Sequence, residues 1–223
     1  MKGLLITFEG TEGGGKSTQI RALAARFHEC GLTVRCLREP GGTPIGEEIR
    51  HTLQYSLNNQ AMTPEDELLL LNASRAQLVR ELIRPALAAG EVVLCDRFYD
   101  STVAYQGYGR RLDLPTVRRV IEVAVGDTRP DLTLLLNVPL AVSEARRQTR
   151  QTESTPLRDR MEEADRGFFQ RVEEGYRAIA ALEPERVKVV DATRSAAQVS
   201  AEIWKHVKRL LASRELGRSP EQT

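Results

Sequence analysis

Short apolar runs rich in β-branched residues recur along the chain, and segments of helical length separate them. In chain order the runs are LLITF, LTVRCL, EVVLCD, DLTLLLNV and RVKVVD. Apolar positions in the intervening segments repeat with a period of about 3.6 residues, which is typical of amphipathic helices. This alternation predicts an α/β fold in which a parallel sheet is covered by helices on both faces.

The clearest helix signal is the segment AMTPEDELLLLNASRAQLVRELIRPALAAG. Thr63 is expected to cap its N-terminus, with Pro64 in the first turn and Asp66 completing the capping interaction. Gly90 is expected to end the helix. Pro85 should kink the last turns, because proline cannot donate a backbone hydrogen bond.

Two further helices are expected over residues 114–126 and 195–213. A chain of 223 residues is long enough for one α/β domain with a substantial core. We therefore expect a single domain over residues 1–213. The polar residues 214–223 have the composition of a disordered tail.

A glycine-rich stretch, FEGTEGGGKSTQ, overlaps the end of the first apolar run. Its spacing fits the phosphate-binding motif G-x-x-x-x-G-K-[ST], with Gly10, Gly15, Lys16 and Ser17 at the specified positions. A strand before the motif and a helix after it are the surroundings in which this loop occurs. The plainer interpretation is a glycine-rich turn, which the motif match and the flanking elements disfavour.

Each residue type in this motif has a physical reason. Backbone amides can wrap a polyphosphate only where side chains do not crowd the approach, so glycines form the nest. The following helix adds its partial positive charge, Lys16 should reach the outer phosphates, and the Ser17 hydroxyl is placed to ligate Mg²⁺. The implied ligand is a nucleoside triphosphate with Mg²⁺. The residues expected to bind it are Gly10, Thr11, Glu12, Gly13, Gly14, Gly15, Lys16, Ser17 and Thr18.

Charge and composition exclude several classes of partner. The formal net charge is +1, whereas general nucleic-acid binders and membrane-surface proteins carry a basic excess. No stretch approaches the ~18 apolar residues of a membrane span, and the N-terminus lacks the features of a signal peptide. We therefore expect a cytoplasmic protein that binds neither nucleic acid nor membrane. Cys30, Cys36 and Cys95 show no paired spacing, so neither disulfides nor a zinc site is expected.

Asp96 and Arg97 stand at the carboxyl end of the third apolar run, in VVLCDRFYDS. Open α/β sheets bind their ligands at this edge. Asp96 can support the Mg²⁺ shell directly or through water, and Arg97 can hold a phosphate in a two-point contact. The alternative is a structural ion pair at a strand end, and the phosphate-binding motif favours the functional interpretation.

Two polar stretches carry weaker signals. The stretch LREPGGTPIGEEIR follows the second apolar run and by pattern alone is a turn before a helix. Arg150, Arg158 and Arg160 flank a polar break that contains a proline, and such charge runs are usually solvated helix faces. In phosphoryl-transfer enzymes, mobile arginines also close over the triphosphate and contribute a factor of about 10³ to 10⁵ in rate.

Together these blocks resemble the bacterial thymidylate kinases, which are P-loop nucleoside monophosphate kinases. The resemblance covers nearly the whole chain through FEGTEGGGKST, REPGGTPIGEEIR, ASRAQLV, DRFYDSTVAYQGYGR, RPDLTLLLNV, DRMEEADRGFFQRVEEGY and VVDAT. It implies a three-layer P-loop NTPase fold with a five-stranded parallel sheet flanked by helices, and a short lid at about residues 147–160. It also implies a homodimer that transfers the ATP γ-phosphoryl group to dTMP with Mg²⁺, giving dTDP and ADP in dTTP biosynthesis.

By position, the resemblance assigns Arg97 and Arg50 to the dTMP phosphate. It assigns Arg75 to the edge of the thymine ring, and Tyr105 to the place where a ribose 2′-hydroxyl would lie. The other residues of the implied dTMP site are Glu12, Leu71, Ser101, Thr102 and Gln106. The implied catalytic residues are Lys16, Arg97, Arg150, Arg158 and Glu12, and the implied metal ligands are Ser17 and Asp96.

Leu71 departs from the family pattern. It precedes Arg75 by one helical turn, so the two side chains share a helix face. In many relatives a phenylalanine at this position stacks on thymine, and aromatic stacking contributes about 1–3 kcal/mol per base in single-strand recognition. We expect weaker dTMP binding or a neighbouring residue that compensates.

Other interpretations stay open. A different P-loop kinase would act on dUMP, another monophosphate or a nucleoside, and Leu71 keeps this interpretation open. A nucleotide-dependent switch or assembly protein would couple hydrolysis to a conformational change, and the second phosphate site argues against it. A structural protein with a vestigial loop would not need Lys16, Ser17, Asp96 and Arg97 together.

Overall fold

A five-stranded parallel sheet forms the centre of the molecule, in the order β2-β3-β1-β4-β5. The computed structural model describes residues 3–153 and 165–216. The strands are β1 (Leu4–Glu9), β2 (Val34–Arg38), β3 (Val92–Asp96), β4 (Leu132–Asn137) and β5 (Val187–Asp191). The predicted α/β fold is confirmed, because every expected apolar run forms one of these parallel strands.

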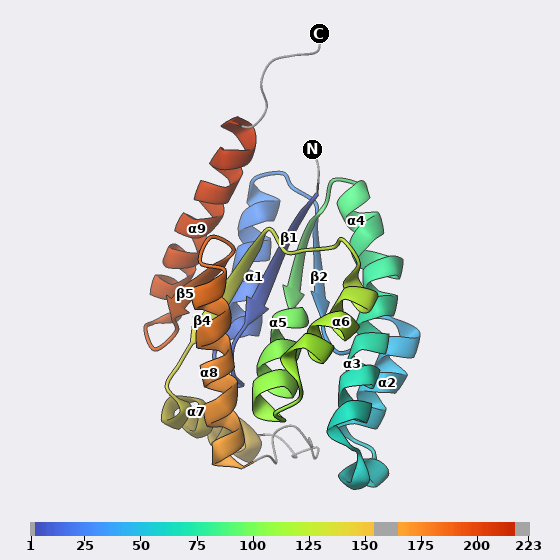
Figure 1. The fold of residues 1–223 in the computed structure, drawn as a ribbon. Coiled ribbons are helices and arrows are strands. Elements are labelled where there is room, and N and C mark those ends of the chain that lie inside the picture. Colours follow the sequence, from blue (N-terminus) through green and yellow to red (C-terminus); the bar gives the residue numbers. More distant parts are fainter. Residues whose placement is uncertain (1–2, 154–164, 217–223) are drawn as a thin grey trace.

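Helices cover both faces of the sheet (Figure 1). Leu5 and the strand residues on the same face of the sheet pack against α3 (Pro64–Leu78), α5 (Tyr99–Thr102), α6 (Leu114–Val125) and α8 (Arg166–Leu182). Ile6 and its neighbours pack against α1 (Lys16–Glu29) and α9 (Ala196–Leu216). Alternate strand residues thus belong to two separate hydrophobic cores, as expected for strands buried on both faces.

The long helix expected between Thr63 and Gly90 is divided into three pieces. The Thr63 hydroxyl accepts a hydrogen bond of 3.2 Å from the Asp66 backbone N–H, which confirms the predicted cap. After α3 a π-helical turn, η2 (Val79–Ile83), precedes α4 (Arg84–Ala88). The interruption comes immediately before Pro85, whose ring nitrogen cannot continue the α-helical hydrogen-bond ladder.

The C-terminal helix is longer than the sequence predicts. We expected the helix to end at Ser213 and a disordered tail to begin at residue 214, but α9 continues to Leu216. Arg214 forms an ion pair with Asp131 and donates a hydrogen bond of 3.0 Å to the Gly3 carbonyl, which anchors the last turn to the sheet. The rest of the expected tail, residues 217–223, lies outside the described residues.

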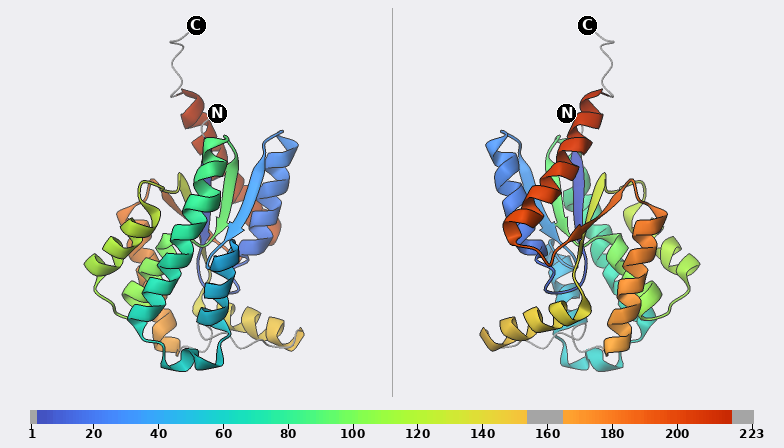
Figure 2. Two further views of the ribbon diagram at one scale, coloured as in Figure 1. Left: turned by 90° about the vertical axis from the view of Figure 1, so that its right-hand side faces the viewer. Right: turned by 90° about the vertical axis from the view of Figure 1, so that its left-hand side faces the viewer.

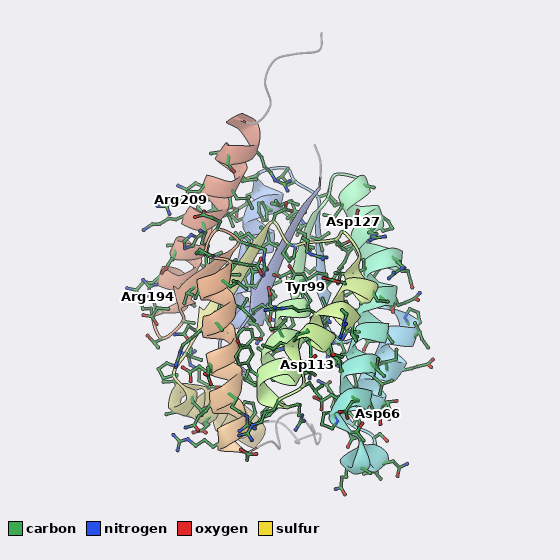
Figure 3. The ribbon with its side chains drawn as sticks, viewed as in Figure 1. Asp66, Tyr99, Asp113, Asp127, Arg194 and Arg209 are labelled. Atoms are coloured by element: carbon green, nitrogen blue, oxygen red, sulfur yellow. The ribbon has the colours of Figure 1, made fainter. Side chains whose placement is uncertain are left out.

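The remaining elements surround the carboxyl ends of the strands. They are α2 (Pro44–Gln54), η1 (Leu57–Ala61), η3 (Val103–Gly109) and α7 (Leu140–Glu153). Figure 2 shows α7 lying across the end of the molecule to which the strands point. Asp113 caps α6 at the same end of the molecule, by accepting a hydrogen bond of 2.9 Å from the Thr116 N–H (Figure 3). None of the helices described is long and apolar enough to cross a membrane.

Candidate nucleotide-binding site

The glycine-rich stretch forms the turn between β1 and α1. Gly10 has a φ of 126° and Gly15 a φ of 86°, which are backbone conformations that side chains disfavour. A Cβ atom on Gly10 would lie 2.4 Å from the Leu136 carbonyl oxygen. The chain can therefore turn sharply beside β4 only with glycine at this position, and the loop amides are left open at the start of α1.

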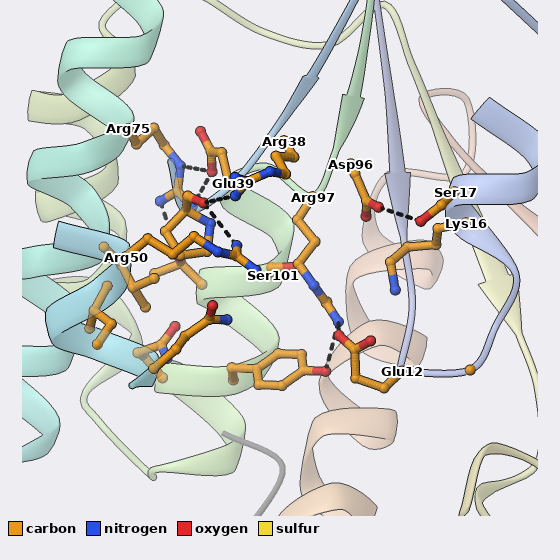
Figure 4. Close-up of a pocket in the computed structure, with 18 of the residues that line it drawn as sticks. Glu12, Lys16, Ser17, Arg38, Glu39, Arg50, Arg75, Asp96, Arg97 and Ser101 are labelled. Carbon is orange, nitrogen blue, oxygen red and sulfur yellow. Dashed lines mark hydrogen bonds and ion pairs between the residues drawn. The ribbon is translucent and has the colours of Figure 1, made fainter. Parts of the chain in front are cut away.

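Lys16 and Ser17 occupy the first turn of α1. The Lys16 ammonium donates hydrogen bonds of 3.1 Å to the carbonyls of Gly10 and Thr11. Its burial, and then the nearby charge of Arg97, lower its pKa from the ordinary lysine value. The Ser17 hydroxyl donates a 3.4 Å hydrogen bond to a carboxylate oxygen of Asp96 (Figure 4). The two expected metal ligands thus lie side by side.

A cavity of about 860 Å³ begins at this loop and extends between α2, α3, η3 and α8. Most of the predicted site residues line it, namely Glu12, Gly13, Gly15, Lys16, Ser17, Thr18, Arg50, Leu71, Arg75, Asp96, Arg97, Ser101, Thr102, Tyr105 and Gln106. Gly10, Thr11 and Gly14 belong to the loop and do not line the cavity. The Arg150 side chain and all of Arg158 lie outside the described residues.

Arg97 lies at the middle of the cavity, between the loop and the arginines of the far end (Figure 4). Its φ of 67° is uncommon for a residue with a side chain and turns it away from the strand β3 that precedes it. The guanidinium donates to a Glu12 carboxylate oxygen at 2.5 Å, to the Ser101 hydroxyl at 3.1 Å and to the Tyr105 hydroxyl at 3.3 Å. A phosphate at this place would meet a cation that is already oriented.

A buried carboxylate, Glu9, supports Arg97 from behind. It accepts hydrogen bonds from the Phe98 N–H at 2.7 Å, from the Ser101 hydroxyl at 2.5 Å and from the Tyr176 hydroxyl at 3.0 Å. Complete burial, together with the charge of Asp100, raises the pKa of Glu9 to about 7. Glu9 thus fixes the backbone of Phe98, which follows Arg97. It also fixes the Ser101 hydroxyl, which accepts a hydrogen bond from Arg97.

Further cations converge on the loop between β2 and α2. Arg38 and Arg50 both donate to the Pro40 carbonyl, at 3.1 Å and 3.0 Å. Arg38 also pairs with Glu47 at the N-terminal end of α2. With Arg97 at the middle of the cavity, these side chains bring three guanidinium groups to the cavity lining, so the end at Arg38 and Arg50 can accept a second anionic group.

Arg75 is held in the wall of the cavity by buried partners. It pairs with Glu39 at 2.7 Å and donates to Asn72 and Thr102, in each case at 2.9 Å. With a further bond of 3.3 Å to the Phe98 carbonyl, every N–H group of the guanidinium is engaged. Burial raises the pKa of Glu39 even though Arg75 opposes the shift.

The same end of the cavity has an apolar lining. Leu53 of α2, Leu71 of α3 and Phe169 of α8 border it, together with Tyr55 and Tyr105. Leu71 and Arg75 both line the cavity, which confirms that they share a helix face. A flat ring can be covered here by aliphatic and aromatic groups while its polar edge reaches the buried polar side chains.

Comparisons with known proteins now decide the family. A family model described as thymidylate kinase matches residues 8–203. The thymidylate kinase of Thermomicrobium roseum is 47% identical over 206 residues, which are 92% of this chain and 95% of that protein. The thymidylate kinase of Geobacter sulfurreducens is 50% identical over 190 residues, 85% of this chain and 89% of that protein. The chain belongs to the thymidylate kinase family.

The solved structures agree with this assignment. The crystal structure of thymidylate kinase from Ehrlichia chaffeensis is 31% identical in sequence and has a TM-score of 0.73. The match covers 93% of this chain and 99% of that one. As a member of the thymidylate kinase family the protein is a phosphotransferase enzyme, and its fold is that of the family.

Sequence reasoning missed several residues that line the cavity. The residues that line the cavity without having been predicted are Arg38, Glu39, Pro40, Leu53, Gln54, Tyr55, Arg146 and Phe169. The stretch LREPGG contains three of them, and its pattern indicated only a turn. Glu9 stands directly before the phosphate-binding motif and closes an apolar run, and this position is the sequence signal that could have identified it.

Proposed function

We propose that the protein transfers the γ-phosphoryl group of ATP to dTMP with Mg²⁺, giving dTDP and ADP in dTTP biosynthesis. The family membership and the names of the relatives support this reaction. The chemistry of the cavity supports it independently, because two differently built anion sites face the same space.

The main support for the proposal is that the two anion sites face one cavity. Lys16 and Ser17 line one end, Arg38 and Arg50 line the other, and Arg97 lies between them. An enzyme that only hydrolysed a triphosphate would need the first end alone. A phosphoryl transferase must hold two polyanions together, and cations fixed in advance reduce the cost of that approach.

At the donor end, the loop amides of residues 10–15 and the N-terminus of α1 would cradle the triphosphate. Lys16 would leave the carbonyls of Gly10 and Thr11 for the outer phosphates. Ser17 and Asp96 offer hard oxygen atoms side by side, a donor set that suits Mg²⁺ with phosphate oxygens and water. When bound, the metal would neutralise charge on the transferring group.

At the acceptor end, Arg97 and Arg50 would hold the dTMP phosphate. A nucleoside monophosphate is largely a dianion at neutral pH, since its second pKa is about 6, and it attacks without a general base. Glu12 keeps Arg97 in place through a contact of 2.5 Å and approaches the acceptor sugar in this proposal. Rate enhancement would then come from alignment and charge stabilisation.

The base and sugar would occupy the apolar part of the cavity. Tyr105 would exclude a ribose 2′-hydroxyl, while Ser101, Thr102 and Gln106 complete the polar wall. Arg75 would contact the edge of thymine by exchanging one of its present partners, such as the Thr102 hydroxyl. Leu71 would cover the ring by apolar contact.

Three further proposals concern the rest of the molecule. The lid at about residues 147–160 would supply Arg150 and Arg158 to the transition state.

We also propose a homodimer, supported by Leu69 on α3 and Val123 on α6, which are 56% and 76% exposed on helices that pack together. The unpaired state of all three cysteines supports a cytoplasmic location.

The decisive experiment measures ADP formation from ATP and Mg²⁺ with dTMP, dUMP, dGMP, dCMP, AMP or water as the acceptor. A strong preference for dTMP is expected. Preference for another monophosphate would indicate a different nucleotide kinase. Hydrolysis that ignores the acceptor would refute phosphoryl transfer and favour a nucleotide-dependent switch.

A further inference from the structure

Behind the polar wall of the cavity lies a carboxylate that does not touch the cavity. Gln106 of η3 lines the cavity, and its Nε2 donates a hydrogen bond of 2.7 Å to Oε1 of Glu67. Glu67 belongs to α3 and is fully buried. A buried carboxylate destabilises the fold unless its charge is paired and its oxygen atoms are hydrogen-bonded, so Glu67 requires partners of both kinds.

Arg110 supplies the pairing charge. Its Nε donates to Oε1 of Glu67 at 3.1 Å, and its Nη2 donates to Oε2 at 3.0 Å. This two-point contact favours the ionised carboxylate, which can only accept hydrogen bonds. The amide of Gln106 must therefore turn its nitrogen toward Glu67, because the reversed amide would set two acceptors against each other.

The direction of this bond decides which atom of Gln106 a ligand meets. With the nitrogen on Glu67, the carbonyl oxygen Oε1 is left over. Among the side chains that the structure describes, in residues 3–146 and 165–214, none donates a hydrogen bond to this atom, and Gln106 lines the cavity. Arg75 and Thr102, which line the same cavity, are bonded to each other. Gln106 thus presents a fixed hydrogen-bond acceptor.

A fixed acceptor distinguishes pyrimidine bases by the proton on ring nitrogen N3. Thymine and uracil carry an N–H there, whereas cytosine carries a lone pair. A carbonyl oxygen forms a hydrogen bond with the first and is repelled by the second, and a site built for such a bond discriminates strongly against the ligand that lacks it. A reversed amide would reverse the preference.

We propose that Glu67 is a positioning residue that fixes the Gln106 amide and thereby selects substrates whose base presents an N–H to the cavity. Glu67 acts from behind the wall and does not contact the substrate. The inference rests on the proposed function, because it concerns how the same site distinguishes the base of its acceptor.

The test replaces the Glu67 carboxylate, which can only accept hydrogen bonds, with an amide, which can also donate them. In Glu67→Gln the amide at position 67 can pair with either orientation of Gln106. The ratio of kcat/KM for dTMP to that for dCMP should fall at least about tenfold, which corresponds to the loss of one oriented hydrogen bond. The KM for ATP should not change. The matched control is Glu183→Gln, which removes a carboxylate from Arg186 outside the cavity and should keep the ratio.

A second variant separates positioning from general damage. Gln106→Met should lower the ratio by itself, and adding Glu67→Gln to it should lower the ratio no further. A ratio that Glu67→Gln leaves unchanged, or lowers equally in the Gln106→Met background, would overturn the proposal. If Glu67→Gln does not fold, an unchanged ratio in Gln106→Met overturns it. A wild-type protein that does not phosphorylate dTMP would instead refute the proposed function itself.

Discussion

The two ends of the cavity are built in different ways. The donor end is built mainly from one loop and the first turn of α1, with Glu12, Gly13 and residues 15–18 at the cavity, and β3 adds Asp96 beside Ser17. The acceptor end draws on four separate elements, α2, α3, η3 and α8, which are spread over residues 44–182. Its polar groups are side chains held in place by other buried side chains, such as Arg75 by Glu39 and Gln106 by Glu67.

The difference reflects what each end would recognise. A triphosphate is the same in every nucleotide, so a loop of amides with one lysine and one hydroxyl is sufficient to bind it. A base is distinguished only by a few polar atoms on its edge. Discrimination of that kind requires donors and acceptors that cannot rotate, and buried ion pairs provide this rigidity at a cost in desolvation.

The largest effect should follow from removing the donor-end cation. In Lys16→Met, kcat should fall about 10³-fold, because an apolar side chain leaves the outer phosphates without the charge of Lys16. Steady-state ADP formation measures the change. The control Lys208→Met removes an exposed lysine of α9 and should retain full activity. Activity within a few fold of wild type in Lys16→Met would contradict the assigned role.

At the centre of the cavity, Arg97→Lys should lower kcat/KM for dTMP about 10²-fold, because lysine keeps the charge and loses the two-point contact. The KM for ATP should change much less. A matched control is Arg177→Lys, which alters an exposed arginine paired with Glu173 on α8. An equal fall in kcat/KM for ATP and for dTMP would show that Arg97 does not act mainly on the dTMP phosphate.

The support behind Arg97 should appear as a pH dependence of stability. Glu9 has a pKa raised to about 7 from the ordinary value of 4.5, so the folded protein holds this proton more tightly than the unfolded chain. Glu9 therefore favours folding less as the pH rises from 4.5 to 7. In Glu9→Gln this contribution disappears.

Urea unfolding at several pH values measures the effect. Between pH 4.5 and 7, the unfolding free energy of wild type should fall relative to that of Glu9→Gln by about 2–3 kcal/mol. Parallel curves for the two proteins would mean that Glu9 titrates in the folded state as it does in the unfolded chain.

The smallest effect concerns the apolar wall. Leu71→Phe should tighten dTMP binding about fivefold, near the lower limit expected for aromatic stacking on a base. Isothermal titration with dTMP measures this, and Leu57→Phe, at an exposed leucine outside the cavity, is the matched control. An unchanged affinity would indicate that a residue already present, with Phe169 as the candidate, supplies the contact.

The same comparison explains what the sequence could predict. Apolar runs and the glycine motif are local signals, so the strands and the loop were expected from the sequence. The end of α9 was misplaced because Arg214 is anchored by Asp131, a residue 83 positions away that no local pattern links to it. Glu9, Glu39 and Glu67 were missed because a glutamate in a sequence does not reveal whether it is buried or which distant groups it contacts.

The central claim is that both ends of the cavity serve one transfer reaction. The most direct measurement is a single turnover of ATP labelled at the γ-phosphate, with Mg²⁺ and with or without dTMP, followed by separation of the products. The account predicts that the label appears in dTDP and that little inorganic phosphate forms in either case. Label released as inorganic phosphate at the same rate with and without dTMP would contradict the account.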